Sequence, residues 1–292
     1  MPFSERHYPI LVTGAAGLLG HALGRRLADA APGADALHLT DLAELDVTDS
    51  GAVAGAFRTL RPQTVFHLAA WTDVDGAEDR PEDARRLNVE AAETVARAAA
   101  GAGARIVHMS TDFIFDGTKP GLYVEDDPPS PLSVYAQTKA EAEARVRAAA
   151  PDAHLIVRTA WLYGAGGRDF LDAILSRARA GDLLRVVTDQ TGCPTWNEDL
   201  ADALVAMVEW GAQGTFQACG GGEASRWDLA VEALRAAGLD TVPERITTSA
   251  MPRPARRPPR AVLSTARLAE TVGFRFPPWQ ESVRRYVESM GA

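Results

Sequence analysis

The 292-residue chain has only two cysteines, Cys193 and Cys219. Small extracellular proteins held together by disulfides use many more, and cysteine-based metal sites need closely spaced pairs. Neither pattern is present here. The N-terminal stretch MPFSERHYPI also lacks the apolar core of a secretion signal. From these absences we expect a reduced, cytoplasmic protein without a disulfide framework.

Long hydrophobic runs and excess positive charge are absent as well. No run of eighteen apolar residues occurs, and the formal net charge is −9. An acidic chain without a large basic cluster is a poor ligand for nucleic acid or for an anionic membrane, so we expect neither partner. One short exception is RPARRPPR at 253–260, which is either a solvated turn or a local anion contact.

Short apolar segments alternate with helical patterns through the first half of the chain. The expected strands are YPILVTG, ALHLTD, TVFHLAA, RIVHMST and HLIVRTAWLYG. Between them, patterns such as leucines at 19, 23 and 27 place apolar side chains on one helical face. This alternation predicts an α/β fold with a Rossmann-type doubly wound parallel sheet.

The second half is less regular and predicts a smaller C-terminal α/β domain that binds substrate. Its helical patterns are RDFLDAILSRARAG, NEDLADALVAMVEWG, SRWDLAVEALRAAG and WQESVRRYVESM, and its short strands are LLRVVTD and GTFQACG. We expect a nucleotide-binding domain at 1–162 and mainly the substrate-binding domain at 163–292. Part of 195–219 is a candidate to return to the first domain.

A glycine-rich turn follows the first expected strand. LVTGAAGLLG places Gly14, Gly17 and Gly20 between a strand and a helix. Such a turn lets the backbone approach a pyrophosphate, and the unpaired N–H groups at the helix N-terminus favour the phosphates. The G-x-x-G-x-x-G spacing is typical of short-chain dehydrogenase/reductase proteins, whereas a turn without a ligand is the plainer interpretation. With Leu18 and Leu19, this turn is the first candidate cofactor site.

The second expected strand ends in an acidic residue, Asp41. It lies near the usual distance from the glycine turn at which a carboxylate accepts hydrogen bonds from the adenosine ribose. This carboxylate would repel the 2′-phosphate of NADPH, and Leu42 beside it supplies no compensating charge. NADH is therefore favoured over NADPH. Asp46 and Val47 are candidates to lie near the adenine, although capping of a turn competes as an explanation for both aspartates.

The stretch SVYAQTKAE places Tyr135 four residues before Lys139, so their side chains share one face of an expected helix. The preceding strand ends in Thr111, and a strand-end hydroxyl followed by Tyr-x-x-x-Lys is the short-chain dehydrogenase arrangement. When hydride reaches a carbonyl carbon, a phenol can protonate the oxygen. We expect the Lys139 ammonium to lower the Tyr135 pKa from about 10, and Thr111 to hold the oxygen. The alternative is a packed tyrosine and an outward-pointing lysine.

A set of motifs carries a resemblance over nearly the whole chain: GAAGLLG, LDVTD, HLAAWTDVDGAE, STDFIFDG, PLSVYAQTKAEAE, RTAWLYG, VVTDQTGCPT and RRPPRAVLS. In these motifs and their order, the chain resembles the dTDP-4-dehydrorhamnose reductase family of extended short-chain dehydrogenases. The STDxxFDG and DQxGxPT motifs distinguish this family from general nucleotide-sugar epimerases. The resemblance implies an NAD(P)H-dependent reduction of the 4-keto group of dTDP-4-dehydro-L-rhamnose to dTDP-L-rhamnose.

The resemblance also implies roles for individual residues. The catalytic set would be Thr111, Tyr135 and Lys139. The cofactor would be lined by the backbone of His67, Leu68, Ala69 and Ala70. The sugar nucleotide would lie near Thr72, Asp73, Val74, Asp112, Trp161, Gln190 and Arg257. Core packing remains an alternative for Trp161, and fixing of a turn remains one for Gln190 and Thr195.

One departure from the family concerns magnesium. Some members form a magnesium-bridged dimer through a glutamate just after the glycine turn, where this chain has His21 and Ala22. Glu198 alone leaves the ligand set incomplete, so we expect no bound metal, and both a monomer and a homodimer remain open.

Two other functions also remain open: a different nucleotide-sugar reductase or epimerase, and a non-catalytic subunit like the regulatory subunit of methionine adenosyltransferase.

Overall fold

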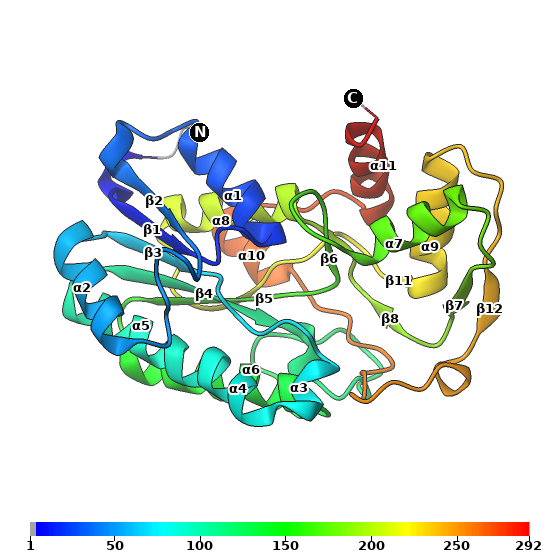
Figure 1. Ribbon diagram of the computed structural model, residues 1–292, viewed down its shortest axis with the longest axis horizontal. Coiled ribbons are helices and arrows are strands. Elements are labelled where there is room, and N and C mark those ends of the chain that lie inside the picture. The colour runs from blue at the N-terminus through cyan, green and yellow to red at the C-terminus, as the bar shows by residue number, and fades with distance from the viewer. Residues whose placement is uncertain (1–3, 292) are drawn as a thin grey trace.

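A six-stranded parallel sheet forms the centre of the computed structural model, which describes residues 4–291 (Figure 1). The strand order is β10-β5-β4-β3-β1-β2, and every neighbouring pair is parallel. The strands are β1 (Ile10–Thr13), β2 (Leu37–Thr40), β3 (Thr64–His67), β4 (Arg105–Thr111), β5 (His154–Thr159) and β10 (Gly214–Gln217). The predicted doubly wound, Rossmann-type α/β fold is confirmed.

Helices cover both faces of the sheet (Figure 1). On one face, α1 (Leu18–Ala28) and α8 (Asn197–Trp210) pack against each other. On the other face lie α2 (Ser50–Leu60), α5 (Ala91–Gly101) and α6 (Val134–Ala149). Within residues 4–291, no helix is both long enough and apolar enough to cross a bilayer.

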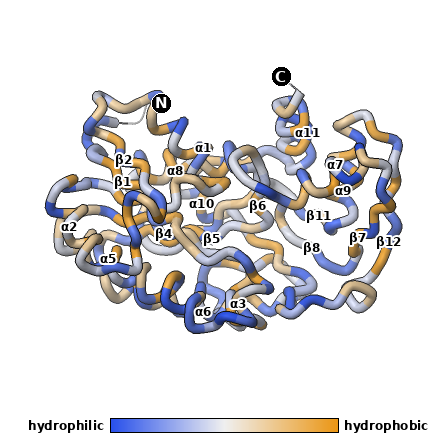
Figure 2. Tube along the Cα trace, viewed as in Figure 1, coloured by the Kyte–Doolittle hydropathy of each residue, from blue (hydrophilic) through white to orange (hydrophobic). Residues whose placement is uncertain are grey.

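Alternate residues of each strand point to opposite faces of the sheet. Ile10 and Val12 of β1 join the apolar cluster beneath α1 and α8, whereas Leu11 joins the cluster beneath α2 and α5. Figure 2 shows hydrophobic residues gathered along the sheet and hydrophilic residues at the periphery. Because both faces are covered, the strands are apolar throughout, and this is the pattern that made them predictable.

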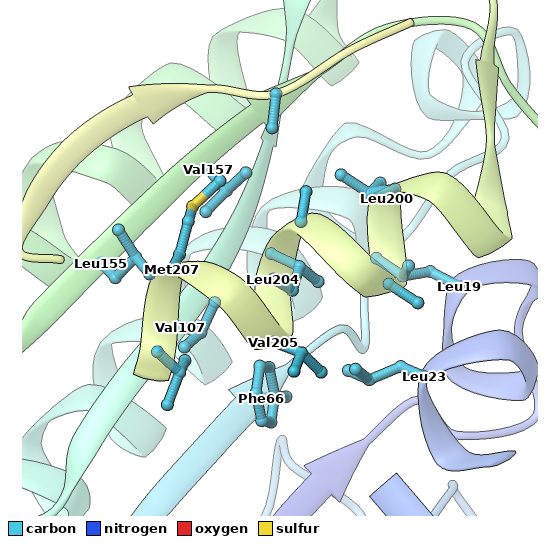
Figure 3. Packing of buried hydrophobic residues seen from close by; sticks show 14 of the residues in the cluster. Leu19, Leu23, Phe66, Val107, Leu155, Val157, Leu200, Leu204, Val205 and Met207 are labelled. Atoms are coloured by element: carbon cyan, nitrogen blue, oxygen red, sulfur yellow. The ribbon is translucent and has the colours of Figure 1, made fainter. Parts of the chain in front are cut away.

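Two stretches from the second half of the chain return to this sheet. α8 lays Leu200 and Leu204 against Leu19 and Leu23 of α1 (Figure 3). The chain then forms β10, which pairs with β5 at the edge of the sheet. α10 (Ala266–Val272), which the sequence patterns did not reveal, packs against α8 and β10.

A smaller α/β unit lies beside the sheet (Figure 1). It contains α7 (Phe170–Arg179), α9 (Arg226–Ala236) and α11 (Trp279–Ser289), and its β7 (Arg185–Val187) pairs with β12 (Glu244–Ile246). The three helices and β7 share an apolar cluster separate from the two beside the sheet. The expected smaller α/β part is therefore present, and a domain boundary at residue 162 stays a prediction.

The remaining elements are short connections between these layers. Two-residue strands pair as β6 (Leu162–Tyr163) with β9 (Thr195–Trp196) and as β8 (Thr191–Gly192) with β11 (Ala224–Ser225). Short helical segments are α3 (Gly76–Asp79), α4 (Pro81–Arg85), a π-helical turn (Arg86–Glu90) and 3-10 turns at Glu5–His7, Ala34–Ala36, Asp112–Ile114 and Thr248–Ala250.

The expected strand HLIVRTAWLYG is broken in two. β5 ends at Thr159, and Trp161 takes the left-handed conformation with a φ of 45°. β6 then pairs with β9 instead of continuing along the central sheet. A left-handed backbone conformation such as that of Trp161 costs about 1–3 kcal/mol for a residue other than glycine. The prediction of one continuous strand is wrong here, because the chain leaves the sheet and turns toward the smaller unit.

A buried ion pair holds α6 on the sheet. Ser133 caps the helix by accepting a hydrogen bond from the Ala136 N–H. Further along, Glu143 accepts hydrogen bonds at 2.8 and 2.7 Å from Arg158 of β5, and both side chains are only 3% exposed. Arg158 also donates to the Glu125 carbonyl. This bidentate pairing satisfies both charges where water is excluded.

We expect Glu143→Gln to lower the free energy of unfolding by about 3–5 kcal/mol, because the Arg158 guanidinium then lies buried without a counter-charge. Urea denaturation followed by circular dichroism measures the change. Glu93→Gln is the control, since Glu93 pairs with Arg97 and Arg145, both largely exposed to water, where each such pair contributes about 0.2–1 kcal/mol. A loss in Glu143→Gln no larger than in this control would contradict the role of the buried pair.

Candidate active site

The site forms where the chain changes direction across the sheet. From β1 the chain continues to β2 on one side, and it then crosses to β3 on the other. The turns after β1 and β3 separate, and α/β proteins bind ligands in the crevice between such turns. A cavity of about 980 Å³ opens at this point. Its walls come from the glycine turn, the ends of the strands and the smaller unit.

The glycine turn has two glycines that build it and one that leaves space. Gly14 has a φ of 71°, and a Cβ there would lie 2.6 Å from the Ala69 nitrogen. A Cβ at Gly20 would lie 2.5 Å from the Gly14 carbonyl oxygen. A Cβ at Gly17 would meet no protein atom closer than 3.4 Å. The open space at Gly17, at the N-terminus of α1, fits a phosphate group. Leu18 and Leu19 also line the cavity.

The two aspartates near β2 differ in their contacts. Asp41 lies beside the glycine turn, where its carboxylate accepts hydrogen bonds from the Ala16 N–H at 3.0 Å and the Leu42 N–H at 2.8 Å. Asp46 accepts two hydrogen bonds from Thr48, and these lower its pKa. Asp46 therefore caps its own turn and also lines the cavity. The cavity lining includes Asp41, Leu42, Asp46 and Val47.

The loop after β3 forms one wall, through Leu68, Ala69, Ala70, Thr72 and Val74. Two residues predicted for the same wall do not line it. The Asp73 carboxylate turns away and accepts the Gly76 N–H at 3.0 Å. His67 lies behind the wall, with its Nδ1 2.8 Å from the Thr13 hydroxyl and its ring stacked on His108. Burial lowers the pKa of His67 to about 3, so the ring is neutral.

The π-helical turn before α5 supplies two residues that the sequence patterns did not single out. Arg86 lines the cavity, and its charge contributes to lowering the pKa of Asp46. Asn88 accepts the Trp71 N–H at 2.8 Å and donates to the Thr138 hydroxyl at 2.9 Å. Asn88 therefore ties the loop after β3 to α6. A single extra residue in a helical turn leaves the apolar pattern almost unchanged, so the sequence carried little signal for it.

The three residues expected to be catalytic meet at the cavity. Thr111 ends β4, close enough to Tyr135 of α6 for its hydroxyl to act on the pKa of the phenol. It also donates to the Asp112 carboxylate at 3.0 Å. Lys139 is buried one helical turn after Tyr135. All three line the same cavity as the glycine turn.

Burial controls the ionisation of this group. It raises the pKa of Tyr135 to about 12, against a smaller opposing effect of the hydrogen bond with Thr111. It lowers the pKa of Lys139 to about 8, partly offset by the charge of Glu143. The expectation that Lys139 lowers the Tyr135 pKa is therefore wrong for this structure, because desolvation penalises the charged forms of both groups. At neutral pH Tyr135 is a neutral phenol and Lys139 is cationic.

Asp112 is a buried carboxyl beside the catalytic group. Burial raises its pKa to about 7, while the hydrogen bond from Thr111 and the charge of Arg226 oppose this shift. Its Oδ2 has no hydrogen-bond partner among residues 4–291. Buried acceptors are normally satisfied, so this oxygen on the cavity wall fits a hydroxyl of a ligand.

Trp161 lines the cavity, but its ring is partly covered. The guanidinium of Arg226 lies 3.6 Å from the ring centroid. Gly192 is also so close that a Cβ there would lie 2.5 Å from the indole. The sequence patterns missed Arg226, because it is the first residue of an otherwise ordinary amphipathic helix.

The other predicted substrate contacts are engaged with the protein itself. Arg257 lines the cavity, yet its guanidinium forms two hydrogen bonds with Asp75 at 3.0 and 2.9 Å. Gln190 lies outside the cavity lining and donates to the Thr248 hydroxyl at 3.0 Å. Thr195 is fully buried and hydrogen-bonds to the Cys193 carbonyl. Gln190 and Thr195 thus fix turns beside the site.

Acidic side chains do not gather into a metal site in the described chain. Among residues 4–291, no group of three or more His, Cys, Asp or Glu side chains could hold an ion. Glu198, the candidate magnesium ligand, pairs with Arg25 at 2.8 Å.

Thr111, Tyr135 and Lys139 face a dinucleotide crevice of a doubly wound sheet, and this arrangement defines an NAD(P)-dependent oxidoreductase of the Rossmann type. The family described as RmlD substrate binding domain matches residues 8–291. A dTDP-4-dehydrorhamnose reductase from Sinorhizobium fredii is 36% identical over 290 residues, which cover 95% of this chain and 96% of that protein. The chain belongs to the dTDP-4-dehydrorhamnose reductase family.

Two further relatives show the range of the family. A Streptomyces antibioticus protein named as a probable dTDP-4,6-dihydroxy-2-methyloxan-3-one 4-ketoreductase is 40% identical over 284 residues, covering 94% of this chain and 92% of that protein. The crystal structure of dTDP-4-dehydrorhamnose reductase from Bacillus anthracis in complex with NADP superposes with a TM-score of 0.92 at 28% identity, covering 96% and 98% of the two chains. The names of these two relatives refer to the reduction of different keto substrates.

We expect Gly17→Ala to keep the fold but weaken NADH binding by about tenfold or more, equivalent to about 1.4 kcal/mol. The added methyl meets no protein atom closer than 3.4 Å, yet it occupies the space above the helix N-terminus. Gly20→Ala is the comparison, since its methyl would lie 2.5 Å from the backbone and should lower the Tm as well. Fluorescence titration with NADH and thermal unfolding measure both effects. If Gly17→Ala binds NADH as tightly as wild type, the pyrophosphate does not lie beside Gly17.

Proposed function

We propose that this protein reduces the 4-keto group of dTDP-4-dehydro-L-rhamnose to dTDP-L-rhamnose, with NADH or NADPH as hydride donor. The observation that carries the proposal is the convergence of Thr111, Tyr135 and Lys139 on the cavity that begins at the glycine turn. The activities for which the Sinorhizobium and Bacillus relatives are named support the same reaction.

The residues of the crevice fit a dinucleotide. Gly14 permits the tight turn, Gly17 leaves room for the pyrophosphate at the N-terminus of α1, and Asp41 is placed for the adenosine ribose. When bound, the reduced nicotinamide supplies the hydride. Asp41 favours NADH, while Arg86 is a cation available to the 2′-phosphate of NADPH. We therefore propose that both cofactors are accepted and that NADH is preferred.

Tyr135 is the proton donor in this proposal. With a pKa of about 12, the phenol keeps its proton until negative charge develops on the carbonyl oxygen of the substrate. Thr111, which lines the same cavity as Tyr135, holds that oxygen beside the phenol. As Tyr135 releases its proton, the Lys139 ammonium stabilises the phenolate that forms. The chain thus supplies a proton, an orienting hydroxyl and a fixed positive charge.

A different dTDP-linked 4-ketosugar is the second candidate substrate, because the 40% identical Streptomyces relative is named for one. The direct test incubates the purified protein with dTDP-4-dehydro-L-rhamnose and NADH, and follows the loss of reduced-nicotinamide absorbance. An epimerase would show no net NADH consumption, and a non-catalytic subunit would show no turnover of the sugar. Faster reduction of another dTDP-4-ketosugar would reassign the substrate and retain the reaction.

We expect Tyr135→Phe to lower kcat by about 10²- to 10⁴-fold, the usual contribution of a general acid, and to leave the Kd for NADH within about twofold. Stopped-flow or steady-state absorbance assays measure the rate. Tyr123→Phe is the matched control, since its hydroxyl bonds to Asp116 at 2.9 Å outside the cavity lining. A parental rate in Tyr135→Phe would show that another group donates the proton.

We expect kcat/KM to fall as the pH rises through about 8, because Lys139 has a pKa of about 8 in the free enzyme and loses its charge above it. A pH profile of initial rates at low substrate concentration measures this limb. In Lys139→Arg the guanidinium stays charged, so the limb should move to higher pH even if the rate is lower. If kcat/KM falls at the same pH in wild type and in Lys139→Arg, the group that titrates is not Lys139.

A further inference from the structure

Arg226 is a cation on the cavity wall that neither the glycine turn nor the catalytic group uses. It is the first residue of α9 in the smaller unit and is partly buried. Its guanidinium contacts two aromatic rings, 3.6 Å from the centroid of Trp161 and 5.2 Å from that of Phe170. A cation–π contact uses none of the N–H donors of a guanidinium, so these donors remain available to an acceptor.

The Arg226 guanidinium lacks the bound counter-charge that Arg257, the other partly buried arginine of this wall, has in Asp75. Within the described chain Arg226 has neither an ion-pair partner nor a side-chain hydrogen bond. Arg168 and Lys139 also lack an ion pair among residues 4–291, but Arg168 is exposed to water and Lys139 belongs to the proposed catalytic set. Burial lowers the pKa of Arg226 to about 10, so it remains charged at neutral pH. A desolvated cation of this kind is stabilised by a bound anion.

The neighbouring charges indicate which anion fits. Arg226 and Arg257 line the same cavity, and their mutual repulsion contributes to the lowered pKa of Arg226. Asp112, at the catalytic end, is close enough for its charge to act on Arg226 but forms no ion pair with it. An anion with more than one charge would relieve the repulsion between the two arginines, and it would leave Asp112 free for a sugar hydroxyl.

We propose that Arg226, held by stacking on Trp161, is the anchor for the diphosphate of the sugar-nucleotide substrate. This rests on the proposed function, since it assumes that the substrate is a nucleoside diphosphate sugar. Arg257 then contributes a second, partly neutralised charge, and its pairing with Asp75 fixes its position. Trp161 acts as the platform for the guanidinium, so it is a positioning residue for Arg226 as well as part of the wall.

The test compares a nucleoside diphosphate with its uncharged nucleoside. We titrate wild type, Arg226→Gln, Arg226→Lys and Arg245→Gln with dTDP by calorimetry and with thymidine by ligand-detected NMR, each in the presence of saturating NADPH so that dTDP cannot occupy the cofactor site. Arg226→Gln should bind dTDP about 10- to 100-fold more weakly and thymidine within about twofold. Arg226→Lys keeps the charge and loses the fork, so its dTDP affinity should lie between those of wild type and Arg226→Gln.

Arg245→Gln is the matched control, because Arg245 also stacks on a tryptophan, 3.9 Å from the Trp227 centroid, but outside the cavity lining. Its dTDP affinity should equal that of wild type. Wild-type dTDP affinity in Arg226→Gln, or an equal loss of thymidine and dTDP, would overturn the assignment, since the residue would then act only through packing. If Arg226→Gln does not fold, a selective loss of dTDP affinity in Arg226→Lys supports the assignment and an unchanged affinity overturns it.

Failure of the proposed function is distinguished by other nucleoside pairs. If wild type binds no dTDP, the same comparison uses UDP with uridine, GDP with guanosine and ADP with adenosine. A selective loss of the diphosphate in any pair supports Arg226 as the anchor while rejecting the thymidine nucleotide as substrate. Absence of diphosphate binding by wild type in every pair overturns the anchor itself.

Discussion

The bidentate pair between Glu143 and Arg158 is the contact on which the placement of Tyr135 and Lys139 beside Thr111 depends. Tyr135, Lys139 and Glu143 follow one another at intervals of one turn, so they share one face of α6. Arg158 lies on β5, directly beside the strand that ends in Thr111. By fixing the last residue of this face to the sheet, the ion pair sets the rotation of α6 and thereby aims Tyr135 at Thr111. Removing water from this interface also produces the strong desolvation of Lys139.

The parts that could be predicted from sequence are those with local signals. β1, the glycine turn and α1 follow one another within twenty residues, and the Tyr-x-x-x-Lys spacing needs only one helix. The return of α8, β10 and α10 to the sheet depends on contacts across much of the chain, so only a part of it was anticipated. The break at Trp161 was missed because an apolar run gives no sign of a left-handed residue. The pairings Arg226–Trp161 and Arg257–Asp75 join distant segments and had no sequence signal.

The ionisation of the site also shows why residue types alone were insufficient. A lysine beside a tyrosine suggested a lowered phenol pKa, on the assumption that both groups keep their hydration. Burial instead moves both pKa values toward the neutral forms, to about 12 for Tyr135 and about 8 for Lys139. In the proposed reaction this is a useful arrangement, because a proton donor must hold its proton until the oxyanion develops. The lysine would then act on the phenolate formed during the reaction rather than on the resting phenol.

The proposed catalytic groups and the proposed diphosphate anchor come from different parts of the chain. The hydroxyl, phenol and ammonium lie on β4 and α6, which are fixed by the central sheet. The guanidinium of Arg226, which has no ion pair within residues 4–291, belongs to α9 of the smaller unit. Trp161 connects the two, since its left-handed backbone turns the chain out of β5 and its indole contacts both Gly192 and Arg226. The backbone strain at Trp161 is thus stored where the sheet meets the smaller unit. If Arg226 anchors the diphosphate as proposed, a substitution in α9 changes which anion is held without disturbing Thr111, Tyr135 and Lys139.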